Sequence, residues 1–362
     1  MWLQFFVAAR QSVTCATVAF LQSLSCRPTL KRHKHWRETM RRLILFLLAL
    51  ALLPIFRMPA SAQMSNMPED LRARLAEINP TWGKDILGNV ATTLALYTPL
   101  LAAAPKDGVR MERDLTYGPD ALHRLDLHKQ EGRTGMPIVV FLHGGAYVRG
   151  SRSVNTEVYG NVATYFARQG MLGVNGTYRL APAAQWPAAA QDVGLLVKWL
   201  KANASAHGGD PERIYLIGHS AGATHIATYL YHSDLQEPNG AGIAGVVLMS
   251  GRYHFDPKPD DPNLTNFQAY FGTDQTRYPA QSPINYVKAA KPMPTFIVIS
   301  EYDNPDLDTQ GALLFGALCE RDRACPRFTR MELHNHLSMV YQFNTADDAL
   351  GRQILEFIRR GR

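Results

Sequence analysis

The feature that most constrains the fold of this chain is the pentapeptide GHSAG at residues 218–222. It follows the apolar, β-prone segment 213–217 and precedes segment 223–232, whose composition favours a helix. A G-x-S-x-G sequence between a strand and a helix predicts a sharp, strained turn that exposes the serine hydroxyl above a sheet. The two glycines leave room where a Cβ would clash, and the N-terminus of the helix favours negative charge. Ser220 is therefore a candidate nucleophile.

A second constraint lies upstream, where the apolar and β-branched segment 137–142 predicts a buried strand. This strand runs into Gly144 and Gly145, which are followed by Ala146. Successive glycines after a strand let backbone N–H groups point into a cavity, as an oxyanion hole requires. The N–H of Ala221, next to the serine, would complete the hole. An ordinary Gly-Gly turn is the alternative, which the serine turn later in the chain disfavours.

Together these segments resemble the α/β-hydrolases of the esterase and lipase group that carry an HGGG-type motif. That group includes hormone-sensitive-lipase-like enzymes, feruloyl-esterase-like enzymes and kynurenine formamidases. The motif is HGGA at residues 143–146 here, and NGTYRLAP at 175–182 and WPAAAQDV at 186–193 resemble two further blocks of the group. The resemblance covers roughly residues 115–360. It implies an α/β-hydrolase fold and hydrolysis by a serine.

One departure from the resemblance lies in the oxyanion motif, where Ala146 replaces the third glycine. Alanine can still donate its N–H, but its Cβ restricts φ. All three residues from Gly144 to Ala146 therefore remain candidates. The departure favours the formamidase and feruloyl-esterase branches, which also vary at this position.

The order Ser, Asp, His that the resemblance implies places the acid after a strand that follows Ser220. Segment 294–300 is the next strongly apolar run, and Asp303 stands at the position that matches the group. Glu301, Asp306 and Asp308 are close competitors. Acidic residues at a helix N-terminus are usually caps, which weakens the last two.

The base is expected after the last strand, predicted over residues 327–333. Two histidines follow this strand, His334 and His336. The group ends this loop with a pattern like N-H-x-S, which residues 335–338 match. His336 is therefore the predicted base, and His334 is the alternative.

Two other histidines adjoin these motifs and are expected to have structural roles. His219 belongs to the serine turn and is expected to face away from a substrate, as it does in the group. His143 is expected to brace the oxyanion loop rather than to transfer protons. The chain contains no H-E-x-x-H, no C-x-x-C and no G-x-x-x-x-G-K sequence. We therefore expect neither a metal nor an organic cofactor.

These parts predict a carboxylic ester hydrolase that acts through an acyl-enzyme, on small or aryl esters. An amide or formamide hydrolase on the same triad is the first alternative. A non-catalytic binding protein would need a damaged triad, and none is visible. Tyr147, Trp186 and Met339 are the candidate pocket residues because they adjoin the motifs. The aromatic residues of segment 253–286 could line the pocket, but buried packing is favoured for them.

The N-terminal residues predict export. Basic residues at 40–42 precede the apolar run 43–53, and residues 60–62 read Ala-Ser-Ala. This pattern is typical of a secretory signal peptide, expected to span 40–62 and to be cleaved after Ala62. The run is too short for a comfortable membrane span, so no stable membrane insertion is expected after cleavage. Residues 1–39 are expected to be an upstream extension from a start codon placed too early, and a genuine N-terminal segment is the alternative.

Charge and cysteine usage agree with export to a periplasmic or extracellular location. Residues 1–62 hold nine of the 38 Lys and Arg residues and one of the 31 Asp and Glu residues. Residues 63–362 therefore carry 29 basic and 30 acidic residues, a net charge of −1, and nucleic acid is not an expected partner. Cys319 and Cys325 are the two cysteines of this part, and we expect them to form a disulfide.

The rest of the chain predicts one catalytic domain. Strand and helix patterns alternate from residue 109 onward, which predicts a mostly parallel sheet with helices on both faces over 109–362. Segment 63–108 contains two predicted helices, at 69–78 and 86–101. They form either a cap over the active site or a strap packed on the surface, and the sequence favours neither alternative.

Overall fold

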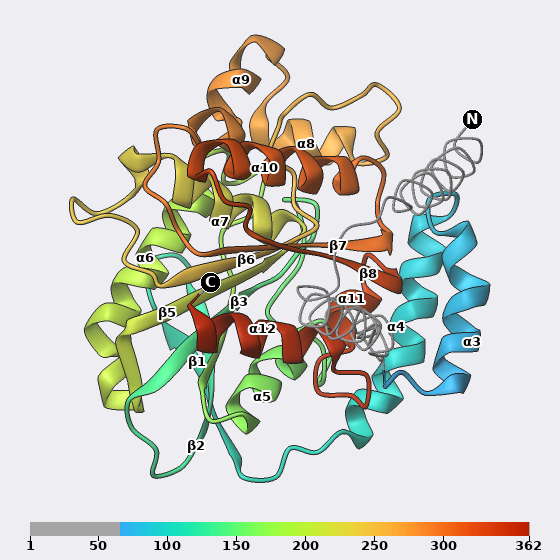
Figure 1. The fold of residues 1–362 in the computed structure, drawn as a ribbon, viewed down its shortest axis with the longest axis vertical. Helices are drawn as coiled ribbons and strands as arrows, with labels where there is room; N and C mark the ends of the chain where they lie inside the picture. The colour runs from blue at the N-terminus through green and yellow to red at the C-terminus, as the bar shows by residue number, and fades with distance from the viewer. Residues whose placement is uncertain (1–65, 362) are drawn as a thin grey trace, which may run out of the picture. The chain divides into compact units, whose positions relative to one another are not determined.

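A computed structural model describes residues 66–361 of the chain. Its centre is one sheet of eight strands in the order β1-β2-β4-β3-β5-β6-β7-β8 (Figure 1). The strands are β1 (Val109–Thr116), β2 (Arg124–Gln130), β3 (Met136–Leu142), β4 (Leu172–Gly176), β5 (Gly209–His219), β6 (Gly245–Met249), β7 (Thr295–Tyr302) and β8 (Arg327–Asn335). The pairs β1–β2 and β2–β4 are antiparallel, and all other neighbours are parallel. The predicted mostly parallel sheet is confirmed.

The helices alternate with these strands along the chain. They are α3 (Glu69–Ile78), α4 (Ile86–Ala103), α5 (Gly160–Arg168), α6 (Ala188–Asn203), α7 (Ala221–Tyr231), α8 (Leu264–Phe271), α9 (Tyr278–Gln281), α10 (Leu307–Asp322), α11 (Ser338–Tyr341) and α12 (Ala349–Arg360). Short 3-10 turns lie at Asn79–Thr81, Ala204–His207, Ser233–Leu235, Gln275–Arg277 and Pro283–Tyr286.

The sheet separates two hydrophobic cores because successive residues of a strand point to opposite faces. In β3, Ile138 and Val140 join the core that α6, α7 and α10 cover. Val139 and Phe141 join the other core, under α5 and α12 (Figure 1). All four side chains are buried, and burying each one stabilises the fold by roughly 1.5–3 kcal/mol. The expected helices on both faces are therefore present.

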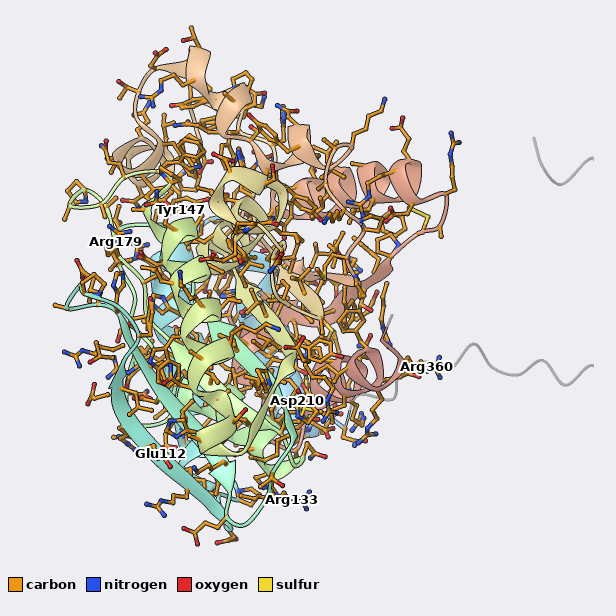
Figure 2. All side chains as sticks on the ribbon, turned by 90° about the vertical axis from the view of Figure 1, so that its left-hand side faces the viewer. Glu112, Arg133, Tyr147, Arg179, Asp210 and Arg360 are labelled. Atoms are coloured by element: carbon orange, nitrogen blue, oxygen red, sulfur yellow. A yellow bond between two sulfur atoms is a disulfide. The ribbon has the colours of Figure 1, made fainter. Side chains whose placement is uncertain are left out.

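One edge of this sheet collects the residues that the sequence singles out. In a parallel sheet the loops after successive strands meet at the carboxyl edge. The strands that end at this edge are followed by Gly144 (after β3), Ser220 (after β5), Ser250 (after β6), Asp303 (after β7) and His336 (after β8). Figure 2 shows Tyr147 at this end of the molecule, far from Arg133 and Asp210 near the amino ends of the strands.

The two helices predicted ahead of the sheet are present as α3 and α4, joined by a turn at Asn79–Thr81. Helix α4 begins after Asp85, whose carboxylate caps it by accepting the N–H of Gly88. It carries no charged side chain. Among the described residues it is the one helix that is long and apolar enough, by length and composition only, to span a membrane.

Two of the expectations for the N-terminus lie outside the described residues, namely the signal peptide at 40–62 and the extension at 1–39. The cysteine pair lies within them. The structure joins Cys319, in α10, to Cys325, in the turn that leads into β8.

Candidate active site

Ser220 stands in the sharp turn between β5 and α7. Its backbone has φ 55° and ψ −121°, a conformation that is strained for a residue with a side chain. Its N–H donates to the backbone oxygen of Met249 at 2.8 Å, which holds the turn against β6. A Cβ at Gly222 would lie 2.3 Å from the carbonyl oxygen of Leu142, and one at Gly218 would lie 2.6 Å from a backbone nitrogen. The predicted strained turn and the need for both glycines are confirmed.

An acid–base pair lies at the same edge of the sheet. Nδ1–H of His336 donates to Oδ1 of Asp303 at 2.6 Å, and both side chains are buried. The backbone N–H of His336 donates to the oxygen of Tyr302 at 3.0 Å, which ties the histidine loop to the end of β7. The structure therefore brings together the predicted acid and the predicted base.

The second oxygen of Asp303 is also bound. The hydroxyl of Ser250 and the backbone N–H of Ser300 both donate to Oδ2. Burial alone raises the pKa of Asp303, but the neighbouring His336 and these hydrogen bonds outweigh it and lower the pKa below its ordinary value. Asp303 is thus an ionised carboxylate that keeps the proton of His336 on Nδ1, so that Nε2 is free to accept another proton.

Ser220 and His336 line one cavity. Among residues 66–361 no hydrogen bond joins the serine hydroxyl to the imidazole. Catalytic hydrogen bonds are often long without substrate and tighten in the complex. The cavity is where a reacting group could contact both side chains.

Two of the three competing carboxylates, Glu301 and Asp308, are engaged elsewhere. Glu301 accepts the backbone N–H of Leu333 at 2.7 Å and pairs with Arg330 at 3.2 Å. Asp306 precedes α10, and Asp308 accepts the N–H of the next residue in the first turn of that helix. Of the four candidates, only Asp303 forms a hydrogen bond with a histidine.

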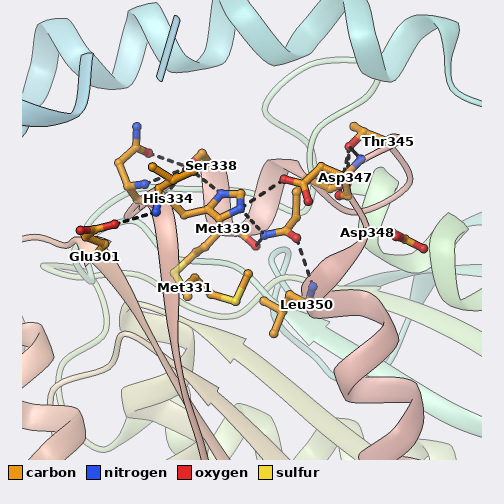
Figure 3. Close-up of polar contacts among 12 residues, drawn as sticks. Glu301, Met331, His334, Ser338, Met339, Thr345, Asp347, Asp348 and Leu350 are labelled. Carbon is orange, nitrogen blue, oxygen red and sulfur yellow. Dashed lines mark hydrogen bonds and ion pairs between the residues drawn. The ribbon is translucent and has the colours of Figure 1, made fainter. Parts of the chain in front are cut away.

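His334, the alternative base, is held in a different place (Figure 3). Its Nδ1 is 3.1 Å from Oγ of Ser338, and its Nε2 is 3.2 Å from Oδ2 of Asp347. All three residues are buried, and none of them lines the cavity of Ser220. Geometry therefore favours His336 over His334.

The predicted oxyanion loop packs directly against the serine turn. A Cβ at Gly144 would lie 2.8 Å from Cβ of Ser220, and one at Gly145 would lie 1.8 Å from a backbone oxygen. Ala146 has φ 48°. This alanine therefore adopts the left-handed conformation, although its Cβ disfavours positive φ. The N–H groups of Gly144, Gly145, Ala146 and Ala221 have no partner among the hydrogen bonds of the described residues. These four groups surround the cavity as candidate oxyanion donors.

His143 braces this loop, as predicted. It is buried, its Nδ1–H donates to the oxygen of Gly144 at 2.7 Å, and its ring stacks on Tyr178. Burial lowers its pKa to about 4, so it remains neutral at ordinary pH. His219 is fully buried beside Ser220. Its Nε2–H donates to the backbone oxygen of His336 at 2.8 Å, which ties the loop of His336 to the serine turn.

The cavity has a volume of about 280 Å³. One of its walls is α4, which contributes the apolar side chains Ile86, Leu87, Val90 and Leu94. The segment before the sheet therefore contributes one wall of the cavity. On the opposite side lie Arg252 and Asp261, a buried ion pair with Nη2 and Oδ2 2.5 Å apart.

Only one of the three predicted pocket residues lines this cavity, namely Tyr147. Trp186 packs instead against the ring of His232, and its backbone N–H donates to the backbone oxygen of Tyr270, in α8, at 2.9 Å. Met339 lies fully buried beneath the site, with its sulfur 3.4 Å from Oγ of Ser250. Of the aromatic residues in 253–286, Phe267 reaches the cavity and the others are buried packing, the favoured alternative.

Sequence reasoning missed Ser250, and it left open whether the helices ahead of the sheet contribute to the site. Ser250 directly follows β6, and its position at a strand end beside the serine turn was the available signal. Its φ of 48° turns the hydroxyl toward Asp303, which residue type alone does not indicate. Within residues 66–361 no three His, Cys, Asp or Glu side chains are grouped so that they could hold a metal ion.

The eight-stranded sheet and the loops at its carboxyl edge form an α/β-hydrolase fold. Comparison with known proteins agrees. The family model described as BD-FAE matches residues 125–237. The esterase of Pyrobaculum calidifontis, a solved structure, superposes with a TM-score of 0.63 at 21% identity, covering 81% of this chain and 98% of that one.

Two curated relatives with similar sequences are named as esterases. Esterase LipC of Mycobacterium tuberculosis is 29% identical over 205 residues, which are 52% of this chain and 49% of the relative. The probable isoprenylcysteine alpha-carbonyl methylesterase of Oryza sativa subsp. japonica is 35% identical over 133 residues, 36% of this chain and 30% of the relative. The matched region thus spans about half of the first relative and less than a third of the second.

Proposed function

We propose that this chain is an exported serine esterase, with Ser220 as nucleophile, His336 as general base and Asp303 as the acid that orients it. The observation that carries the proposal is the shared cavity, where a strained serine turn meets a buried histidine–carboxylate pair. The names of the similar proteins support ester hydrolysis.

The reaction follows from this geometry. Oγ of Ser220 attacks the ester carbonyl carbon while its proton passes to Nε2 of His336. The carbonyl oxygen becomes an oxyanion, which the N–H groups of the Gly144–Ala146 loop and of Ala221 stabilise. The imidazolium then gives its proton to the departing alcohol oxygen, and an acyl-enzyme remains. Water, deprotonated by the same histidine, hydrolyses the acyl-enzyme and restores Ser220.

Asp303 contributes by keeping His336 in one tautomer and by stabilising the imidazolium that forms in both steps. Its own proton affinity is low because His336, Ser250 and Ser300 all stabilise the carboxylate. The acid therefore stays ionised while the histidine changes its charge.

The size and lining of the cavity support small esters. A volume of about 280 Å³ lies at the lower end of the range for small-molecule pockets. Its apolar wall from α4 and the rings of Tyr147 and Phe267 suit a short acyl chain or an aryl group. Small or aryl carboxylic esters are therefore the proposed substrates.

Export is part of the proposal and rests on the signal-like pattern at 40–62 and on the cysteine pair. Mass spectrometry of the secreted or periplasmic protein is expected to find Gln63 as the N-terminus and no peptide from residues 1–39. A free-thiol count of zero without reductant is expected for this form, since only Cys319 and Cys325 remain in it. Two free thiols or an uncleaved N-terminus would contradict export.

The test of the activity is hydrolysis of a p-nitrophenyl acyl series by the chain and by its Ser220→Ala variant. We expect release of nitrophenol that depends on Ser220, with a preference for short acyl chains. Turnover of N-formyl aromatic amides with no ester turnover would favour a formamide hydrolase on the same triad. Equal release by both proteins, or none from either class of substrate, would overturn the proposal.

A further inference from the structure

The turn between α3 and α4 touches both loops that carry the acid and the base. Nδ2–H of Asn79 donates to the backbone oxygen of Leu333 at 2.8 Å, just ahead of the histidine loop. Nε1–H of Trp82 donates to Oδ1 of Asn304 at 3.0 Å, and Asn304 directly follows Asp303. Asn79 and Trp82 are both buried. A segment of four residues thus binds the chain on both sides of the acid–base pair.

A second tie runs through Asn335, the residue before His336. Its Nδ2 donates to Oδ1 of Asn79 at 3.0 Å and to Oγ1 of Thr93, in α4, at 3.2 Å. Its Oδ1 accepts the backbone N–H groups of Leu337 and Ser338. The amide therefore uses both of its donor hydrogens and both of its lone pairs, and it is fully buried. A fully satisfied buried network of this kind rigidifies its surroundings.

The same segment forms the substrate wall. Immediately after Trp82, α4 places Ile86, Leu87, Val90 and Leu94 on the cavity. Leu87 is 75% exposed, so nothing among the described residues covers it. Helix α4, which would contact the substrate, and the turn before it are therefore joined by hydrogen bonds of 2.8–3.2 Å to residues near Asp303 and His336.

We propose that Asn79 and Trp82 are positioning residues. They fix the loops of Asp303 and His336 relative to each other and link both loops to helix α4. This inference rests on the proposed function. Neither residue needs to contact the reacting atoms, because each acts through a neighbour of the acid or the base. Misplacing catalytic groups by about 1 Å can cost on the order of 100-fold in rate. Loss of these ties should therefore lower kcat, whereas loss of the wall alone should raise KM.

The test uses the full chain and p-nitrophenyl acetate, whose acyl group is too small to depend on the wall. Trp82→Phe keeps the ring and removes only the N–H donor, and Asn79→Ala removes both a donor and an acceptor. We expect kcat to fall about fivefold or more in Trp82→Phe and further in Asn79→Ala, with KM within twofold of the parent.

Asn89→Ala is the matched control. Asn89 lies in the same segment and is buried, but within residues 66–361 its amide binds only Thr81 and reaches neither catalytic loop. It is expected to lower the melting temperature as much as Asn79→Ala does while leaving kcat unchanged. If Asn79→Ala and Trp82→Phe also leave kcat unchanged, or alter KM alone, the positioning role is overturned.

Labelling of Ser220 by a fluorophosphonate separates this inference from the proposed function. A parent chain that is neither labelled nor active on esters would overturn the proposed function and the inference with it. A parent chain that is active, with positioning variants labelled as fast as the parent, would overturn the inference alone. Slower labelling of both variants, with the Asn89→Ala control at the rate of the parent, supports it.

Discussion

Two buried histidine–carboxylate pairs lie two residues apart at the end of β8, and each has a serine hydroxyl beside it. His336 binds Asp303, which in turn accepts the hydroxyl of Ser250. His334 lies between Asp347 and the hydroxyl of Ser338. The residue types are the same in both clusters. The first pair borders the cavity of the strained serine, and the second is enclosed between α11 and the loop that follows it.

The comparison shows that residue types do not define a catalytic triad. Ser338 sits in the first turn of a short helix with ordinary backbone geometry and full burial, so no substrate can reach its hydroxyl. Ser220 has the strained turn, the free N–H groups and the cavity. The two clusters differ in their access to the cavity of Ser220 and in the imidazole itself. Both ring nitrogens of His334 have partners, whereas the hydrogen bonds of the described residues give His336 a partner on Nδ1 alone.

The largest contrast is expected between the two histidines. His336→Gln should lower kcat for p-nitrophenyl acetate by roughly 10⁴-fold or more, because it removes the proton acceptor of the serine. His334→Gln should keep kcat within a few-fold and lower the free energy of unfolding by about 1–3 kcal/mol, because a buried hydrogen bond is lost. Steady-state kinetics and urea unfolding measure both effects. A greater loss of kcat in His334→Gln would move the base to that residue.

The two carboxylates provide the next contrast. Asp303→Asn should reduce kcat by up to about 10⁴-fold, because an amide holds the imidazole in the wrong tautomer. Asp347→Asn should leave kcat near that of the parent and act on stability only. The same assay on both variants decides the matter, and near-normal activity in Asp303→Asn would exclude it as the acid.

The two supporting serines should differ by less. Ser250→Ala removes a hydrogen bond to an ionised carboxylate and should lower kcat about tenfold, in line with the ~1.5–3 kcal/mol of such bonds. Ser338→Ala removes the hydroxyl beside His334 and should lower the melting temperature with little change in kcat. Equal kcat values in the two variants would show that Ser250 does not help to position Asp303.

The smallest effect concerns a buried histidine that has no carboxylate partner. Burial lowers the pKa of His225 to about 3, against an ordinary value of 6.5. As the pH falls below 6.5 the unfolded chain binds this proton first, so the free energy of unfolding decreases until the pH reaches the folded pKa. His225→Phe keeps the aromatic packing and should reduce the stability lost between pH 7 and pH 5 by ~2 kcal/mol. Urea unfolding at the two pH values measures this, and identical losses in both proteins would contradict it.

The sequence predicts the sheet, its helices and the loops of Ser220, Asp303 and His336, because each follows from a local pattern. The apolar strands, the glycines of the serine turn and the motif order carry this information within a few residues. The structure places Asp303 and His336 within 2.6 Å of each other although 33 positions separate them, as the shared sheet edge requires.

Other parts of the site depend on the directions in which side chains point. Local sequence patterns do not determine these directions. Met339 is fully buried and Trp186 packs against His232, so adjacency to the predicted motifs overstated the roles of both residues. The contact of Trp82 with Asn304 spans 222 positions and depends on how α3 and α4 pack against β7 and β8. The conformation of Ala146 follows from the tight fit of its loop against the serine turn.

The loops that form the candidate active site are far apart in the sequence, and this separation affects when activity can arise during folding. The oxyanion loop lies near residue 144, the serine at 220, and the acid and base after residue 300. Contacts between such distant segments form slowly, because closing a long loop costs conformational entropy before any stabilising contact is made. Ester hydrolysis is therefore expected to return late on refolding, after helical circular dichroism has recovered. Partly folded chains would be inert, because the loops of Ser220 and His336 have not yet come together.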